Sequence, residues 1–368
     1  MQLLTFSNCQ LDPSLGSGKT RLRWTEGLRN LGHEVSVVEP HDFRKRPFRK
    51  ADQLKFSLDA IPGGLQTHWR DVDIVEVFGG EFGLLTASLY KLRKHGRPKI
   101  IAHADGLELL ARERAKVYDP ATHSKLHHRF ASSVYGSIDM LSFKHTDGFV
   151  CGSDEDLRYF RSIKSLSKIP SRSIAPGVDP EFLNRPFQPN GKHRVAYLGT
   201  WTTRKAPDRI VRVMTQVFQI DAKTTFHVFG SPSQKEEILK AFAPCFRERV
   251  VVYPKLSAED LAGQLSQCSL LFFPSHNEGF GMALTEAMAC SLPIVTTPTG
   301  FGSDLQDGVD GLVCDFEDEA KMRDSILLLL ADKEERTRIA KNGWNRIQSL
   351  NWETQIKSLE STYLEWLS

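Results

Sequence analysis

Short apolar segments alternate with helical patterns along the chain, and this alternation limits the possible fold more than any other feature. Near the start, an apolar segment is followed by a glycine-bearing turn, a helical pattern at residues 20–32 and another apolar segment. A strand, a helix and a strand in this order predict parallel strands joined by a right-handed crossover. The segments with strand character in this first series are residues 2–7, 33–40, 73–79, 99–105 and 148–153.

A second series of the same kind begins after a proline-rich connection at residues 179–190. Its apolar segments are residues 193–199, 224–230, 249–254, 269–275 and 292–298. Two such series predict an α/β protein with two doubly wound, Rossmann-like domains. We place the first domain at residues 1–185, the second at 186–350 and a final amphipathic helix at 351–368. Ligands of such sheets lie outside the carboxyl ends of the strands, so we expect the site in a cleft between the domains.

The overall charge of the chain excludes one class of function. Its 368 residues include 48 Lys and Arg against 45 Asp and Glu, a net charge of +3, which argues against a protein that coats nucleic acid. The charge is uneven, because residues 1–185 carry a net +6 and the remainder a net −3. This excess predicts an anionic partner for the first domain, unless it is a chance fluctuation.

The cysteines and the apolar runs constrain the cellular location. The six cysteines are scattered, and none lies in a CxxC pair or in a Cys/His cluster with zinc-ligand spacing. Free thiols of this kind are typical of the reducing cytoplasm. The longest aliphatic run, Ile326–Leu330, is far shorter than the about 20 residues of a membrane helix. Residues 1–10 do not have the pattern of a secretory signal, so we expect a cytoplasmic protein.

A glycine-rich turn, GSGKT at residues 16–20, ends like the phosphate-binding loop of nucleoside triphosphatases. That loop needs another glycine five positions before Gly18, where this chain has Pro13, so we do not assign a triphosphatase loop. Glycines at the start of a helix still let backbone N–H groups approach a phosphate, which makes Gly16 and Gly18 candidate phosphate-binding residues. A tight turn without a ligand is the alternative.

Two acidic clusters are candidate metal sites. Asp71 and Asp73 resemble the paired acids that hold a metal–nucleotide complex in some sugar transferases, but they directly precede an apolar strand, where acids commonly end a surface loop. Asp154 and Asp156 follow Ser153, and a serine cap with acids in the first helical turn needs no ligand. We therefore predict neither a metal site nor a bound cofactor.

The most informative segment is the loop and helix that follow residues 269–275. Gly279 and Gly281 expose backbone N–H groups where the helix begins, which suits a diphosphate. Glu278 can accept hydrogen bonds from sugar hydroxyls, and Glu286, eight residues later, can reach a ribose. Alternatively, Glu278 is a helix cap and Glu286 a plain surface residue.

This segment resembles the signature of retaining family 4 glycosyltransferases with the GT-B fold, whose motif has two glutamates with seven residues between them. The resemblance continues in SIAPGVDPEF at residues 173–182, VAYLGTWTTRKAPD at 195–208 and LQDGVDGLVCDFED at 305–318. It is strong over residues 170–320 and weaker before them, where LRNLGHEVSVVEP looks like the first crossover of the family. The resemblance implies a nucleotide-sugar donor in the second domain and an acceptor in the first.

The resemblance also implies roles for individual residues. Glu278 and His103 are the candidate catalytic residues: Glu278 would bind hydroxyls of the donor sugar, and His103 would lie near that sugar. Glu286 would bind the nucleotide ribose, while Lys205 and Arg204 would neutralise the diphosphate. The other residues implied at the donor are Gly16, Gly18, Gly199, Asn277, Gly279, Phe280, Gly281 and Met282.

The chain departs from the family pattern at three positions. Thr200 follows the glycine of a strand end where the family often has arginine, which leaves Arg204 and Lys205 as the nearby cations. Ala206 and Ser291 stand where the family usually has glycine.

These observations predict a metal-independent, retaining glycosyltransferase of the hexosyltransferase type. It would move a sugar from a nucleoside diphosphate sugar to a hydroxyl of a glycan, a glycolipid or a small molecule. No carboxylate is evident as the nucleophile of a double displacement, and the family favours a same-face reaction in which the donor phosphate helps to deprotonate the acceptor. The alternatives are a scaffold that binds nucleotide sugars without turnover and a GT-B sugar-nucleotide epimerase, which does not usually carry this glutamate spacing.

Basic segments in the first domain suggest contact with a membrane. Residues 41–56 hold six Lys and Arg interleaved with three Phe, and residues 111–130 are also basic. Such segments could contact anionic headgroups, or a lipid-linked acceptor, at the inner face of a membrane. A solvated loop is the alternative.

Overall fold

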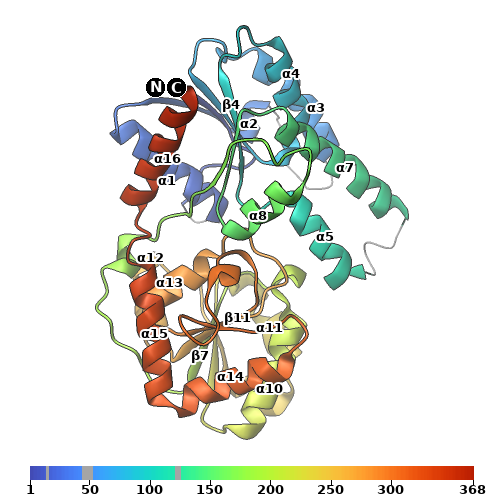
Figure 1. Ribbon diagram of the computed structural model, residues 1–368. Coiled ribbons are helices and arrows are strands. Elements are labelled where there is room, and N and C mark those ends of the chain that lie inside the picture. Colours follow the sequence, from blue (N-terminus) through green and yellow to red (C-terminus); the bar gives the residue numbers. More distant parts are fainter. Residues whose placement is uncertain (14–15, 44–52, 121–125) are drawn as a thin grey trace. The chain divides into compact units, whose positions relative to one another are not determined.

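The chain forms two compact units in the computed structural model (Figure 1). The described residues are 1–13, 16–43, 53–120 and 126–368. The first unit comprises Met1–Gly177 together with Trp352–Ser368, and the second comprises Val178–Asn351.

The structural division lies before the predicted boundary between residues 185 and 186, because the proline-rich segment packs on the second unit. Its short helix α9 (Pro180–Leu183) contacts α12 (Ala258–Leu265) and α13 (Met282–Ala289). The C-terminal helix α16 (Trp352–Leu367) packs against α1 (Gly16–Asn30) and so belongs to the first unit.

A parallel sheet of six strands, in the order β2-β1-β3-β4-β5-β6, is the centre of the described part of the first unit. The strands are β1 (Gln2–Phe6), β2 (Glu34–Val38), β3 (Ile74–Phe78), β4 (Lys99–Ala104), β5 (Gly148–Cys151) and β6 (Ser171–Ser173). The further helices of this unit include α2 (Pro40–Phe43), α3 (Gln53–Leu65), α4 (Gly83–Leu92), α5 (Glu108–Tyr118), α7 (Leu126–Lys144) and α8 (Asp154–Ser162). Strands β3 and β5 are buried along their whole length, as expected of a parallel sheet covered on both faces.

The second unit repeats this architecture, with the strand order β12-β11-β10-β7-β8-β9. Its strands are β7 (Arg194–Leu198), β8 (Thr225–Phe229), β9 (Val250–Val252), β10 (Leu270–Phe273), β11 (Ile294–Thr296) and β12 (Leu312–Val313). The longer helices besides α12 and α13 are α10 (Pro207–Ile220), α11 (Lys235–Ala241), α14 (Glu319–Ala331) and α15 (Lys333–Ile347). Because β7 and β10 are neighbours, the loops that follow them meet at the carboxyl edge of the sheet.

The predicted α/β class and the two parallel sheets are confirmed: each of the ten apolar segments contains a strand. The edge strands β6 and β12 were not predicted, because they are only three and two residues long. Within the described ranges, no helix is long and apolar enough to cross a membrane. All six cysteines are free thiols.

Candidate functional site

The loop that leads from β10 into α13 carries the predicted donor-binding motif. Gly281 is the N-cap of α13 and adopts φ 91°, a left-handed conformation that glycine reaches without steric cost. The helix begins at Met282, so the backbone N–H groups of its first turn lie directly after the motif. Asn277 and Glu278 are buried in this loop, whereas Gly279 is half-buried.

Residues that follow the neighbouring strand β8 hold the loop after β7 in place. Gly230 adopts φ 88°, and a Cβ atom there would lie 3.1 Å from the backbone N of Gly199. Ser231 donates a hydrogen bond of 2.6 Å to the carbonyl of Gly199. Gln234 Oε1 accepts a hydrogen bond of 3.1 Å from the backbone N–H of Trp201, and Gln234 Nε2 donates one of 2.7 Å to the carbonyl of Trp201. These contacts hold the loop close to β8 and position the residues that follow it.

The two loops meet through ion pairs to Glu278. Lys205 Nζ lies 2.6 Å from Glu278 Oε1, and Arg204 Nη1 lies 3.1 Å from Oε2. The Arg204 guanidinium also donates to the carbonyl of Asn277 at 2.8 Å, and the backbone carbonyl of Arg204 accepts a hydrogen bond of 2.9 Å from the backbone N–H of His276. The structure therefore brings together four of the predicted site residues, Arg204, Lys205, Asn277 and Glu278.

Burial and charge act in opposite directions on these groups. Burial alone would raise the pKa of Glu278, but Lys205 and Arg204 outweigh it and hold that pKa below its ordinary value. Burial lowers the pKa of Lys205, and the carboxylate of Glu278 opposes this shift. The side chain of Lys205 is 9% exposed, whereas that of Arg204 is 42% exposed. Glu278 is thus an ionised carboxylate with one buried and one accessible cation.

A second glycine supports the motif loop and was missed from the sequence. Gly300 adopts φ 52°, and a Cβ atom there would lie 2.5 Å from the carbonyl oxygen of Phe280. That carbonyl accepts a hydrogen bond of 2.7 Å from the backbone N–H of Phe301. The sequence signal was the TPTG turn at the end of the last predicted strand. The remaining predicted residue of this unit, Glu286, lies on α13 and is half-buried.

In the first unit, the predicted phosphate-binding glycines lie at the start of α1. Gly16 is the exposed first residue of the helix. Gly18 is buried, and a Cβ atom there would lie 2.6 Å from the carbonyl of Gln10 and 2.8 Å from the backbone N of Asp12. Close packing of the preceding loop therefore requires Gly18 whether or not a ligand binds.

His103 lies near the end of β4 inside the first unit and is 1% exposed. Its Nε2 atom is 2.8 Å from the hydroxyl of Tyr363 on α16, and that hydroxyl donates to Glu76 on β3. Its ring stacks on Phe78, with the centroids 4.2 Å apart. Burial, aided by Arg21, lowers the pKa of His103 to about 3, so the ring is neutral. Almost no surface of His103 is accessible in this conformation.

Hydrogen bonds within the first unit account for acids of both candidate metal clusters. Asp73 accepts a hydrogen bond of 2.8 Å from the backbone N–H of Gln2. Ser153 caps α8 by accepting from the backbone N–H of Asp156, as the sequence predicted. Among the residues that the structure describes, no group of three or more His, Cys, Asp or Glu side chains could hold a metal ion.

Comparisons with known proteins show which proteins the chain resembles. Residues 179–346, nearly the whole second unit, match the family described as glycosyl transferases group 1. The chain is 25% identical over 170 residues to an uncharacterized glycosyltransferase of Methanocaldococcus jannaschii, which covers 46% of this chain and 47% of that protein. It is 29% identical over 188 residues to the D-inositol 3-phosphate glycosyltransferase of Salinispora tropica, covering 48% of this chain and 39% of that protein. The chain therefore spans about half or less of the curated relatives that it matches.

Solved structures extend the likeness to the whole fold. Sucrose-phosphate synthase from Thermosynechococcus elongatus is 17% identical and superposes with a TM-score of 0.79, covering 99% of this chain and 98% of that one. HepE of Anabaena, in complex with UDP-glucose, is 14% identical with a TM-score of 0.70, covering 99% and 100%. The chain has the GT-B fold, as predicted. Its second unit resembles the glycosyl transferases group 1 family, whose model it matches.

Proposed function

We propose that this chain is a retaining glycosyltransferase that moves a hexose from a nucleoside diphosphate sugar to a hydroxyl acceptor. The observation that carries the proposal is the buried carboxylate of Glu278, paired with two cations beside the N-terminus of α13. The names of the relatives and the UDP-glucose bound to the Anabaena protein support a nucleotide-sugar donor.

The geometry suggests how such a donor would be held. A carboxylate offers about four lone-pair positions, and the two cations use one on each oxygen of Glu278, so sugar hydroxyls can donate to the others. Arg204 is accessible and would turn from Glu278 toward the diphosphate. The N–H groups that begin α13 would receive the same diphosphate.

The chemical step would use these positive groups rather than a metal ion. Glycosyl transfer expels a nucleoside diphosphate, and negative charge grows on it in the transition state. Hydrogen-bond donors and cations of the protein that are fixed where this charge develops lower the energy barrier of the transfer. We propose the same-face route in which the departing phosphate oxygen takes the proton of the acceptor hydroxyl, so that no enzyme carboxylate forms a bond to the sugar.

The proposal is tested with a panel of nucleoside diphosphate sugars. A bound donor raises the melting temperature of the protein by linkage, and turnover is then measured as release of the nucleoside diphosphate. We expect Glu278→Gln to lower kcat/KM by roughly 100-fold or more in protein that circular dichroism shows to be folded. Glu236→Gln, at an 87% exposed position of the same unit, is the matched control. Donor binding without turnover would favour the scaffold alternative, and inversion of the anomeric carbon would exclude the retaining reaction.

The location of the protein is a further proposal. We propose a cytoplasmic protein, supported by the six free cysteines.

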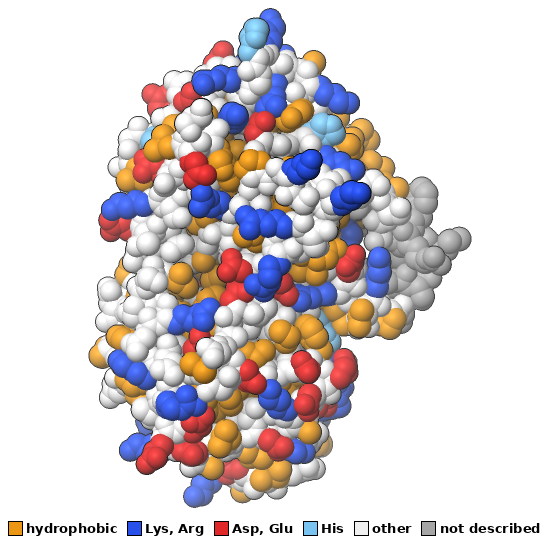
Figure 2. All heavy atoms as spheres, viewed as in Figure 1, with side chains coloured by type: hydrophobic (Ala, Val, Ile, Leu, Met, Phe, Trp, Pro, Cys, Tyr) orange, Lys and Arg blue, Asp and Glu red, His pale blue; other side chains and the backbone are white. Residues whose placement is uncertain are grey.

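Contact of the first unit with an anionic membrane is a separate hypothesis. Most of the basic segment at 41–56 lies outside the described residues, and on α5 Arg112 and Arg114 are paired with Asp139 and Glu155. On the face shown in Figure 2, acidic and basic side chains are interspersed. Sedimentation with anionic vesicles at low salt tests the hypothesis, and no binding there would refute it.

A further inference from the structure

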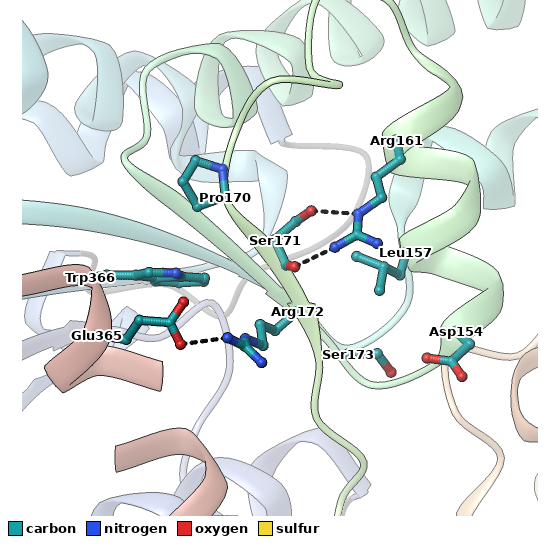
Figure 3. A pocket seen from close by; sticks show the side chains of 9 residues that line it. All are labelled: Asp154, Leu157, Arg161, Pro170, Ser171, Arg172, Ser173, Glu365 and Trp366. Atoms are coloured by element: carbon teal, nitrogen blue, oxygen red, sulfur yellow. Dashed lines mark hydrogen bonds and ion pairs between the residues drawn. The ribbon is translucent and has the colours of Figure 1, made fainter. Parts of the chain in front are cut away.

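The end of the C-terminal helix α16 is fixed on two strands of the first unit. The ring of Trp366 rests on β5, because a Cβ atom at Gly148 would lie 2.4 Å from one of the ring carbons. Glu365 pairs with Arg172 of the edge strand β6 at 2.5 Å (Figure 3). These contacts hold the last turns of the helix, and with them Tyr363, in a defined position on the sheet.

The hydroxyl of Tyr363 joins two buried side chains of this sheet. It donates a hydrogen bond to Glu76 Oε1 on β3, and Thr5 on β1 donates to the other oxygen, Oε2. His103 on β4 has its Nε2 atom 2.8 Å from the same hydroxyl. All four side chains are buried, so bulk water does not compete for these hydrogen bonds.

The direction of the hydrogen bonds determines which nitrogen of His103 carries a proton. A tyrosine hydroxyl has one proton, and Tyr363 donates it to Glu76, so its oxygen can only accept from His103. Nε2 must therefore carry a proton. Burial lowers the pKa of His103 to about 3, so the neutral ring has no second proton and Nδ1 keeps a free lone pair.

This direction holds for both charge states of Glu76. Burial raises the pKa of Glu76, and the hydrogen bonds from Thr5 and Tyr363 oppose this shift. In the neutral form the proton can lie on Oε2, where the hydroxyl of Thr5 can accept it, and Oε1 still accepts from Tyr363. Glu76 can therefore hold His103 in the same tautomer whether it is ionised or neutral.

Nδ1 of His103 is buried and has no hydrogen-bond partner among the described residues. The same is true of the indole N–H of Trp24 and of Nε of Arg21. Both residues pack against the ring of Phe78, on which His103 stacks. Buried polar groups without a partner are rare in folded proteins. Three of them around one ring mark a place where a polar group from outside these residues can bind.

We propose that Glu76 and Tyr363 are positioning residues, which hold His103 as the Nε2–H tautomer and so keep Nδ1 free to accept a hydrogen bond from a substrate hydroxyl. The proposal rests on the proposed function and extends it, because it gives a role to the C-terminal helix and to a buried carboxyl group. An acceptor at Nδ1 selects a hydroxyl over an ionised phosphate oxygen, which has no proton to donate.

Nitrogen-15 NMR of the histidine-labelled full chain near neutral pH tests the tautomer without a substrate. The spectrum distinguishes protonated from unprotonated ring nitrogens, and His103→Gln assigns the signals of His103. We expect a protonated Nε2 and an unprotonated Nδ1. In Glu76→Met the hydroxyl of Tyr363 loses its acceptor and should donate to Nε2, so the proton of the ring should move to Nδ1.

Tyr363→Phe is the matched control for Glu76→Met. It removes the hydroxyl but leaves the carboxyl group of Glu76 3.6 Å from Nε2, so the Nε2–H form should persist. Three results would overturn the proposal: an Nδ1–H form in the parent, an Nε2–H form in Glu76→Met, or a move of the proton to Nδ1 in both variants. If Glu76→Met does not fold, the parent spectrum still decides.

Activity tests whether Glu76 acts through His103. Glu76→Met should lower kcat/KM by about tenfold or more, and adding it to His103→Gln should cause no further loss. Ser361→Ala, exposed on α16, is the control. Losses that multiply in the double variant, or an unchanged kcat/KM in His103→Gln, would refute the positioning role. The spectra need no substrate, so a failure of the proposed function and a failure of the tautomer assignment are observed separately.

Discussion

Lys205 and Glu278 form an ion pair that is almost closed to solvent, with Nζ 2.6 Å from Oε1 and side chains 9% and 6% exposed. The pair joins the loops after two neighbouring strands, β7 and β10. Lys205 also lies 4.4 Å above the ring of Phe273. This pair links the stability of the second unit to the charge of the proposed donor site.

Replacing one residue of this ion pair should lower the free energy of unfolding more than replacing both residues. Lys205→Met leaves the buried carboxylate of Glu278 paired with the more exposed Arg204 and should lower the free energy of unfolding by about 1–3 kcal/mol, because Glu278 loses its buried partner. The double variant Lys205→Met with Glu278→Leu should recover most of this loss and remain inactive. Urea denaturation gives the free energies. Arg212→Gln, in an exposed pair with Glu319, is the control and should cost less than about 1 kcal/mol. Equal losses in the single and double variants would contradict the interpretation.

The contact between Gly300 and Phe280 predicts a loss of activity from a small substitution. Gly300→Ala places a methyl group 2.5 Å from the Phe280 carbonyl, which must shift the motif loop. A displacement of this kind can lower kcat/KM by about 100-fold. Gly308→Ala is a matched control, because Gly308 also has positive φ, 74°, but a Cβ atom there meets nothing within 4 Å. Both variants should lose about 1 kcal/mol of stability from the backbone, and only Gly300→Ala should lose activity. Similar kcat/KM values for the two would refute a role for this contact.

The sequence predicted the fold and the motif loop well, because both depend on local patterns. The buried strand before the motif and the glycine at the helix start are visible in LLFFPSHNEGFGMALTEAMA itself. The ion pairs of Glu278 were not predictable, since Lys205 lies 73 residues away and meets it only because β7 and β10 are neighbours. Ala206 and Ser291 adopt φ 56° and 66°, a left-handed conformation that favours glycine. This conformation explains why the family usually has glycine at these two positions. It was not predictable from this chain, whose residues there are alanine and serine.

The surroundings of His103 were the least predictable part of the candidate site. Its partner Tyr363 lies 260 residues away on α16, and no local pattern reports that contact. Tyr363→Phe removes the hydroxyl that joins His103 to Glu76 and leaves both buried groups short of a partner. We expect a loss of about 1–3 kcal/mol in the free energy of unfolding, with faster amide exchange in α16. Ser361→Ala, exposed on the same helix, is the control.

The predicted catalytic role of His103 requires a separate measurement. His103→Gln keeps a nitrogen that can reach Tyr363 and removes the imidazole. If His103 contacts the donor sugar, His103→Gln should lower kcat/KM by roughly 100-fold in folded protein. A loss of stability with unchanged kcat/KM would instead identify His103 as a residue of the core.

Asp156 should make the stability of the first unit depend on pH. Its carboxyl group is 1% exposed and accepts a hydrogen bond of 3.1 Å from the backbone N–H of Leu107, which caps α5. Burial raises its pKa to about 8, against an ordinary value of 3.8. The folded state therefore holds a proton that the unfolded chain releases near pH 4. Asp156 therefore makes its full contribution to the free energy of unfolding below pH 4. This contribution is lost as the pH rises toward 8, at up to about 1.4 kcal/mol per pH unit.

Urea denaturation between pH 4 and pH 8 tests this dependence. Asp156→Asn keeps the acceptor oxygen for Leu107 but does not ionise, so the free energy of unfolding should fall less steeply with pH and should exceed that of the parent at pH 8. Asp154→Asn, two residues earlier and exposed, is the matched control and should follow the parent curve. If Asp156→Asn gives the same pH dependence as the parent, Asp156 titrates near its ordinary pKa, and α5 is held at Leu107 by a charged rather than a neutral carboxyl group.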